Sequence, residues 1–194
     1  MRAFRVFIFI LITVGLVWLT IILIGKALST TPATTTTTQT KSLSRYDATN
    51  TELVMLIDGP VQSDQTHQSL RITVAQNENA IELMNGYEGQ VVNREAFASN
   101  SIAYAAFLKS LDKIGFGKPA LKSISADERG YCPLRNRFIY TIEENGTQKQ
   151  RTWTSSCGIG NYAGDQTLTR RLFIDQIPAD AFRNILRSTS FSTQ

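Results

Sequence analysis

The sequence predicts an α+β fold, in which an antiparallel sheet of hairpins packs against one main helix and short C-terminal helices. Three observations indicate this class. Segments between residues 51 and 84 alternate apolar and polar side chains, Asn145-Gly146 separates two β-favouring runs, and residues 99–114 carry apolar side chains at helical spacing. An N-terminal transmembrane helix and a disordered Thr-rich linker are predicted to precede this domain.

The N-terminal segment is predicted to anchor the chain in a membrane. Residues 6–25 contain no charged side chain, and a helix of this length spans about 30 Å, the thickness of the hydrocarbon core. We expect a retained anchor; the alternative is a signal peptide cleaved at Ala27-Leu28-Ser29. Arg2 and Arg5 precede the run and only Lys26 follows it closely, so the positive-inside bias predicts a cytoplasmic N-terminus and an extracytoplasmic domain at the plasma membrane.

The chain is predicted to have three parts. Residues 1–28 form a cytoplasmic stub and the anchor, residues 29–44 a flexible linker, and residues 45–194 the exported domain. Eight of the 16 linker residues are threonine and only Leu43 is large and apolar, so the linker buries too little surface to offset the entropy of ordering.

The charge balance excludes some classes of function. All 16 acidic residues lie after residue 44, together with 16 of the 20 basic residues, so the exported domain is formally neutral. A neutral domain argues against a nucleic-acid partner. One histidine and two cysteines leave little material for a zinc site, and we expect neither a metal nor a cofactor.

The first half of the exported domain is predicted to be β-structure. The apolar run Leu53–Ile57 ends at the turn signal Asp58-Gly59-Pro60, which predicts a strand covered on both faces. Residues 69–76 alternate in polarity, and Ile81 and Leu83 share a face in the next segment. These two segments predict a hairpin.

Three helices are predicted further along the chain. The longest covers residues 99–114, with Ser99 or Asn93 as its N-cap and Gly115 after its last turn. A second covers residues 168–175, and a short final helix begins at Pro178 and ends near residue 186.

A second hairpin is predicted between residues 137 and 155, because Asn145-Gly146 is a strong signal for a two-residue turn. Such a turn places Phe138 opposite Trp153. Cys132 and Cys157 flank the hairpin almost symmetrically, so we expect a disulfide between them in an oxidising compartment, and not two free thiols.

Few residues qualify as catalytic. His67 is the only imidazole and lies in a polar stretch, so we expect an exposed loop histidine. The pairs Asp127-Glu128 and Glu143-Glu144 have no evident reason to titrate abnormally and are expected to be surface charges. We therefore predict no catalytic residue, with a hydrolase that uses His67 or an acidic pair as the alternative.

Two features suggest a binding surface. A Gly-rich segment follows the disulfide, and its residues form a candidate recognition loop on a rigid base: Gly158, Gly160, Asn161, Tyr162 and Gly164. Residues 45–100 carry a net charge of minus five and residues 101–194 plus five. If these halves segregate in space, one side of the domain is basic, and it would carry Arg135, Arg137, Arg151, Arg170 and Arg171.

The last third of the chain resembles known sequences. The segments 131–134, 137–140, 151–158 and 171–178 are similar to those of uncharacterised small single-pass membrane-anchored extracytoplasmic proteins of ultrasmall episymbiotic bacteria. This resemblance implies no activity and no site residue.

The sequence thus favours a membrane-anchored extracytoplasmic binding module for adhesion, envelope assembly or host contact, with a protein or an anionic surface polymer as its partner. The alternatives are an envelope-associated hydrolase and an inhibitor of a secreted enzyme that presents the loop 158–164.

Overall fold

The computed structural model describes residues 43, 46 and 48–189. The predicted span 6–25 and nearly all of the linker lie outside these residues. Within the described part of the chain, no helix combines the length and apolar character that crossing a membrane requires.

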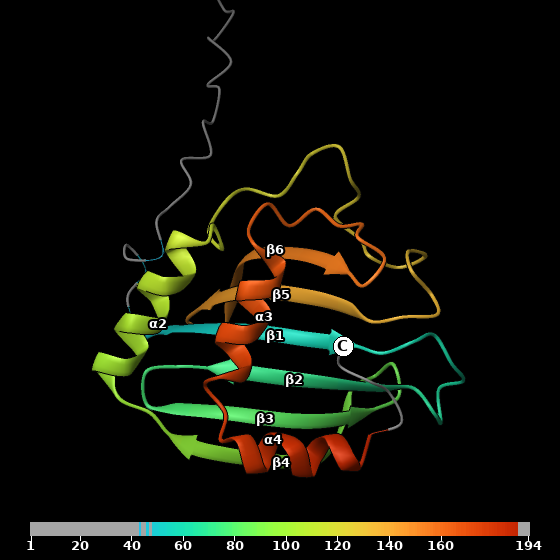
Figure 1. The fold of residues 1–194 in the computed structure, drawn as a ribbon, viewed down its shortest axis with the longest axis horizontal. Coiled ribbons are helices and arrows are strands. Elements are labelled where there is room, and N and C mark those ends of the chain that lie inside the picture. Colours follow the sequence, from blue (N-terminus) through green and yellow to red (C-terminus); the bar gives the residue numbers. More distant parts are fainter. Residues whose placement is uncertain (1–42, 44–45, 47, 190–194) are drawn as a thin grey trace, which may run out of the picture. The chain divides into compact units, whose positions relative to one another are not determined.

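The described residues form one six-stranded antiparallel sheet and three helices (Figure 1). The strands are β1 (Thr51–Asp58), β2 (Gln68–Val74), β3 (Glu78–Asn85), β4 (Gln90–Ala98), β5 (Arg137–Glu144) and β6 (Thr147–Ser155). The helices are α2 (Ser101–Lys113), α3 (Gln166–Ile174) and α4 (Ala179–Arg187). The sheet order is β4-β3-β2-β1-β5-β6, so the predicted α+β class is confirmed.

The core lies between the helices and one face of the sheet. Alternate residues of β1 and β2, among them Met55 and Ile72, are completely buried there, as strand periodicity requires. Phe107 of α2 and Phe173 of α3 contact each other edge to face in the same cluster. Figure 1 shows α3 crossing the strands in the foreground, whereas α4 runs roughly along the strand direction in front of β4.

The opposite face of the sheet is covered only in part. Trp153 of β6 is fully buried, and its indole Nε1 donates to the Ser125 carbonyl in the segment between α2 and β5. Val54 and Leu56 of β1 are only half-buried. The prediction that β1 is covered on both faces is therefore only partly correct, since one face is buried and the residues of the other face are half-buried or exposed.

The edge strand β4 is not predicted from the sequence. Its burial pattern is almost entirely exposed, so it lacks the alternation that marks a half-buried strand. Cross-strand charges hold it to β3: Arg94 donates to Glu78 at 2.5 Å and to Glu82 at 3.2 Å. Charged side chains on an edge strand also oppose pairing with another chain.

The three predicted helices are confirmed, with one corrected cap. Asn100, not Ser99 or Asn93, caps α2, since its side-chain oxygen accepts from the backbone N–H groups of Ile102 and Ala103. The side chain of Asp165 caps α3 through Leu168 N–H.

The β5–β6 hairpin turns at Asn145-Gly146 as predicted, and both residues have positive φ. Its register differs from the prediction, because a β-bulge after Ile142 shifts the pairing by one residue. Trp153 therefore lies opposite Ile139 and not opposite Phe138. The predicted disulfide Cys132–Cys157 is present.

Leu43 belongs to the folded domain and not to the linker. Its side chain is completely buried in the core, and its backbone N–H donates to Asp112 Oδ1 at 3.1 Å. The prediction that Leu43 belongs to a flexible linker is therefore wrong.

Candidate functional site

His67 lies in a buried polar cluster at the end of β1. Its side chain is 3% exposed, and Nε2 lies 2.9 Å from Asp58 Oδ1. Arg137 Nη2 donates to Asp58 Oδ2 at 2.7 Å and to the Gly59 carbonyl at 3.2 Å. We call Asp58, His67 and Arg137 the Asp58 cluster. The prediction of an exposed loop histidine is wrong.

The packing around His67 explains its burial. The ring of Tyr87, from the β3–β4 turn, stacks on the imidazole at 4.0 Å. The Tyr87 hydroxyl donates to the Gln62 carbonyl, and its backbone N–H donates to Asp64 Oδ1. No local sequence signal relates Tyr87 to His67, because the two meet only through the pairing of β2 with β3.

The Asp58 cluster is suited to joining strands. His67 Nδ1 lies 3.2 Å from the Pro60 carbonyl, so both ring nitrogens face oxygen atoms. For both contacts to be hydrogen bonds, one proton lies on Nδ1 and a second lies between Nε2 and Asp58. Burial raises the pKa of Asp58, while the charges of Arg137 and His67 act in the opposite direction. The cluster thus ties the end of β1 to the start of β5.

The surroundings of His67 do not form a nucleophile–base pair. A general base must reach the group that it activates, but both nitrogens of His67 are occupied. The nearby hydroxyls of Ser63 and Thr66 bond each other at 2.9 Å. Cys157 is held in the disulfide.

The pair Asp127-Glu128 divides into two separate ion pairs. Asp127 is half-exposed and pairs with Arg129 at 2.6 Å; hydrogen bonds from Arg129 lower the pKa of Asp127 to about 2. Glu128 is buried and accepts from Arg151 Nη2 through both carboxylate oxygens, at 2.7 and 2.6 Å. Glu128 is therefore not the surface charge that was predicted, since the fold brings Arg151 of β6 against it.

The pair Glu143-Glu144 is half-buried at the end of β5, not fully solvated as predicted. Glu144 lies 3.9 Å from Lys149 of the neighbouring strand.

The candidate recognition loop is largely internal. Tyr162 is 7% exposed, and its hydroxyl bonds the Thr169 hydroxyl at 2.6 Å. Asn161 is 1% exposed; its Oδ1 accepts from Trp153 N–H and its Nδ2 donates to the Ser125 carbonyl. Burial therefore corrects the prediction that these side chains form a recognition surface.

The glycines of this loop divide by exposure. A Cβ on Gly160 would meet the backbone of β6 at 2.4 Å, and one on Gly164 would meet the Tyr162 hydroxyl at 2.4 Å. Both glycines permit close packing. Gly158 has a φ of +77°, open space where a Cβ would stand, and an exposed position. The end of the loop next to the disulfide is thus the part that reaches the surface.

The five arginines of the predicted basic side have different environments. Arg137 and Arg151 are neutralised by Asp58 and Glu128. Arg171 is largely exposed and lies 3.7 Å from Asp175. Among the described residues, no carboxylate lies within ion-pair distance of Arg135 or Arg170.

Arg135 and Arg170 line the same pocket. It has a volume of about 270 Å³ and lies between the end of β6 and α3; we call it the arginine pocket. Its lining residues are Arg135, Phe138, Ser155, Ser156, Gln166 and Arg170. The guanidinium of Arg170 lies over the Phe138 ring at 4.5 Å. Two cations and no carboxylate line this pocket, so its chemistry suits an anion.

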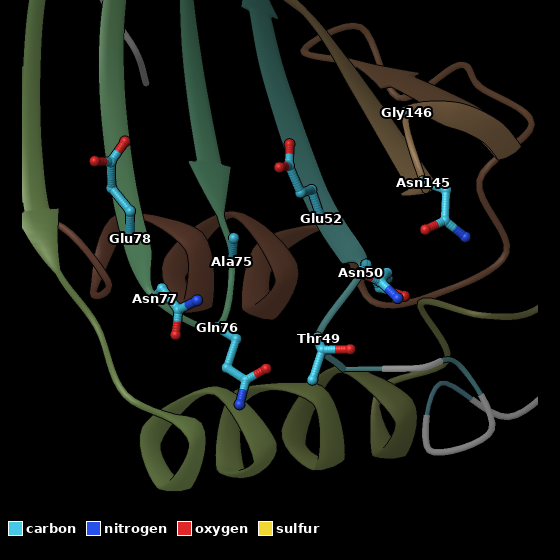
Figure 2. A pocket seen from close by; sticks show the side chains of 10 residues that line it. Thr49, Asn50, Glu52, Ala75, Gln76, Asn77, Glu78, Asn145 and Gly146 are labelled. Atoms are coloured by element: carbon cyan, nitrogen blue, oxygen red, sulfur yellow. The ribbon is translucent and has the colours of Figure 1, made fainter.

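A second pocket lies at the opposite end of the sheet (Figure 2). It has a volume of about 370 Å³ and is formed where the start of β1 and the β2–β3 and β5–β6 turns meet. Figure 2 shows Glu52 and Glu78 on the strands, whereas the Gln76 side chain points toward α2. Amide, hydroxyl and carboxylate groups line it, and no basic residue does. The described residues contain no group of three or more His, Cys, Asp or Glu side chains placed to hold a metal.

The two pockets therefore differ in charge. In the β1–β5 register, Thr51 pairs with Glu144 at one end and Asp58 pairs with Arg137 at the other. The acidic groups Glu52 and Glu78 lie at the first end and the arginine pocket at the second. Of the five arginines predicted to form the basic side, Arg135 and Arg170 thus line one pocket at one end of the sheet.

Comparison with known proteins returned no family model, no curated protein and no solved structure that matches this chain. The resemblance of the last third to small proteins of episymbiotic bacteria remains a prediction.

Proposed function

We propose that this protein is a membrane-tethered extracytoplasmic module that binds an anionic partner. The observation that carries the proposal is the arginine pocket, where Arg135 and Arg170 lie without a carboxylate partner among the described residues. Unneutralised guanidinium groups in a pocket attract an anion and bind it through a planar set of donors.

Two further features support an exposed binding role outside the cytoplasm. The disulfide Cys132–Cys157 is typical of proteins that fold in an oxidising compartment. The apolar run at residues 6–25 and the Thr-rich segment that follows suit a tether that holds the domain away from a bilayer.

The test uses the full-length chain in membranes of the cells that express it. We expect added protease to remove the C-terminal domain from intact cells, and the two cysteines to resist alkylation until a reductant is added. Recovery of the chain from the cytosol with free thiols would contradict the proposed location.

Binding is tested on the detergent-solubilised, full-length protein with anionic and cationic polymer-coated beads. We expect retention on the anionic beads only, with a retained fraction that falls as the salt concentration rises. Equal retention on both kinds of bead would contradict an anionic partner.

A further inference from the structure

We propose that the arginine pocket binds a phosphate monoester group. This inference deepens the proposed function, since it names the chemical class of the anion, and it rests on that function. The pocket brings together donor groups from three parts of the chain: Arg135 before β5, Ser156 after β6, and Arg170 on α3.

The charge of the pocket matches a dianion. Arg135 and Arg170 supply two positive charges, and no lining residue supplies a negative one. A phosphate monoester carries between about 1.5 and 2 negative charges at pH 7, whereas a carboxylate carries one. Among single anionic groups, the phosphate monoester therefore neutralises the lining more completely.

The pocket also contains donors that are left without acceptors. Ser156 Oγ and Arg170 Nε are buried atoms, and neither has a hydrogen-bond partner among the described residues. A buried donor without an acceptor lowers the stability of the folded domain, and a ligand that accepts from it removes this cost. A phosphate group has three terminal oxygens in a tetrahedral arrangement, so it can accept from several sides at once, whereas the two oxygens of a carboxylate lie in one plane.

The other polar groups of the lining have fixed roles. Ser155 Oγ donates to the Ile159 carbonyl at 2.7 Å, and Gln166 Oε1 accepts from the Thr154 hydroxyl at 2.5 Å. The second contact occupies the amide oxygen of Gln166 and leaves its NH₂ group as a further donor. The lining thus offers donors and hardly any free acceptor.

The scaffold holds these donors in place before a ligand arrives. Stacking on the Phe138 ring orients the Arg170 guanidinium. The disulfide joins the two segments that carry the other donors, since Cys132 lies three residues before Arg135 and Cys157 directly follows Ser156. Preorganised donors lose less entropy when they bind.

The size of the pocket limits the ligand. Its volume of about 270 Å³ lies just below the range of about 300 to 1,000 Å³ that holds drug-sized molecules. The pocket therefore accommodates a phosphate group with a small part of the molecule that carries it.

The experiment measures binding of glycerol 3-phosphate to the full-length protein in detergent micelles by isothermal titration calorimetry. Nanodiscs of phosphatidylcholine with and without phosphatidic acid present the same group on a lipid, so the two arms distinguish a soluble source from a lipid source. Acetate is the carboxylate comparison. We expect saturable binding in at least one phosphate arm and weaker binding of acetate.

Matched variants locate the site. We expect Arg170→Gln to weaken binding about tenfold or more, as for loss of a charge-assisted hydrogen bond, and Ser156→Ala to weaken it severalfold. Arg171→Gln removes the same charge from the next residue of α3, where the side chain is 77% exposed, and it should leave the affinity within about twofold. Arg170→Lys keeps the charge and should still weaken binding, because lysine lacks the planar fork.

Three results would overturn the inference: equal weakening by Arg170→Gln and Arg171→Gln in variants with wild-type thermal melting, acetate binding as strong as that of glycerol 3-phosphate, or no saturable binding in either phosphate arm. If the protein is still retained by the anionic beads, only the phosphate assignment fails. Loss of that retention as well would contradict the proposed function itself.

Discussion

The Asp58 cluster and the arginine pocket contain arginines that lie only two residues apart in the sequence, Arg137 and Arg135, yet they use them in opposite ways. Arg137 is 4% exposed and is neutralised by Asp58 at 2.7 Å. Arg135 is exposed and lines a pocket without a carboxylate. The difference teaches that the partner, and not the residue type, decides whether an arginine stabilises the fold or remains available to a ligand.

The sharpest test of this comparison exchanges one arginine at a time. We expect Arg137→Gln to lower the free energy of unfolding by about 3 to 5 kcal/mol, because it leaves Asp58 as a buried charge without its main partner. Arg135→Gln should change it by less than about 0.5 kcal/mol. Urea denaturation of the two variants measures both values, and similar losses would remove the distinction.

The disulfide affects both regions, because it joins the loop before β5 to the end of β6. We expect the double variant Cys132→Ser, Cys157→Ser to lower the free energy of unfolding by about 3.5 kcal/mol, the chain-entropy value for a loop of this length. Affinity for glycerol 3-phosphate should fall as well, since Arg135 and Ser156 lose their common restraint. Unchanged affinity at a temperature where the variant is folded would show that the pocket does not depend on the crosslink.

Tyr162 tests whether a buried side chain of the loop 158–164 contributes to stability or to ligand binding. Removing its hydroxyl with Tyr162→Phe leaves the buried Thr169 hydroxyl without this partner. We therefore expect a loss of about 1 kcal/mol in the free energy of unfolding and no change in ligand affinity. Circular dichroism during thermal unfolding and the calorimetric titration measure the two effects. A change in affinity without a change in stability would support the predicted recognition role of Tyr162.

The smallest expected effects are those of pH on the stability contributions of Asp58 and Asp127. Burial raises the pKa of Asp58, so its contribution to stability is complete below the unfolded value of about 3.8 and is lost as the pH rises through the raised folded value. The pKa of Asp127 is lowered to about 2, so its contribution is present above the unfolded value and is lost as the pH falls toward 2. Carboxyl carbon chemical shifts, followed by NMR against pH, should show Asp127 titrating first as the pH is raised and Asp58 later. The reverse order would contradict the burial of Asp58.

Local chemistry explains which parts of the fold were predicted correctly. The turn at Asn145-Gly146, the helical spacing near residues 99–114 and the flanking cysteines each depend on neighbouring residues or on short loops. The exposed strand β4 lacks a periodic signal of its own, so it was missed. The register of β5 with β6 was predicted one residue out, because a bulge is not visible in the alternation of side chains.

The candidate site was much less accessible to prediction. The sequence could name five arginines on a basic half, but it could not pair Arg151 with Glu128 or Arg137 with Asp58, since these partners lie 23 and 79 residues apart. The same limit applied to His67 and Tyr162, which polar or Gly-rich neighbours suggested were exposed. Burial is a property of the packed chain and not of a short window.

By itself, the sequence determined the α+β class, the helices, the second hairpin and the disulfide, because propensity, periodicity and loop closure act over short distances along the chain. Only the tertiary structure decided which charges are neutralised and which remain free. Opposite charges attract over a few ångströms in space, whatever their separation in sequence. The arginine pocket exists because Arg135 and Arg170 come together on the folded domain while the carboxylates pair elsewhere.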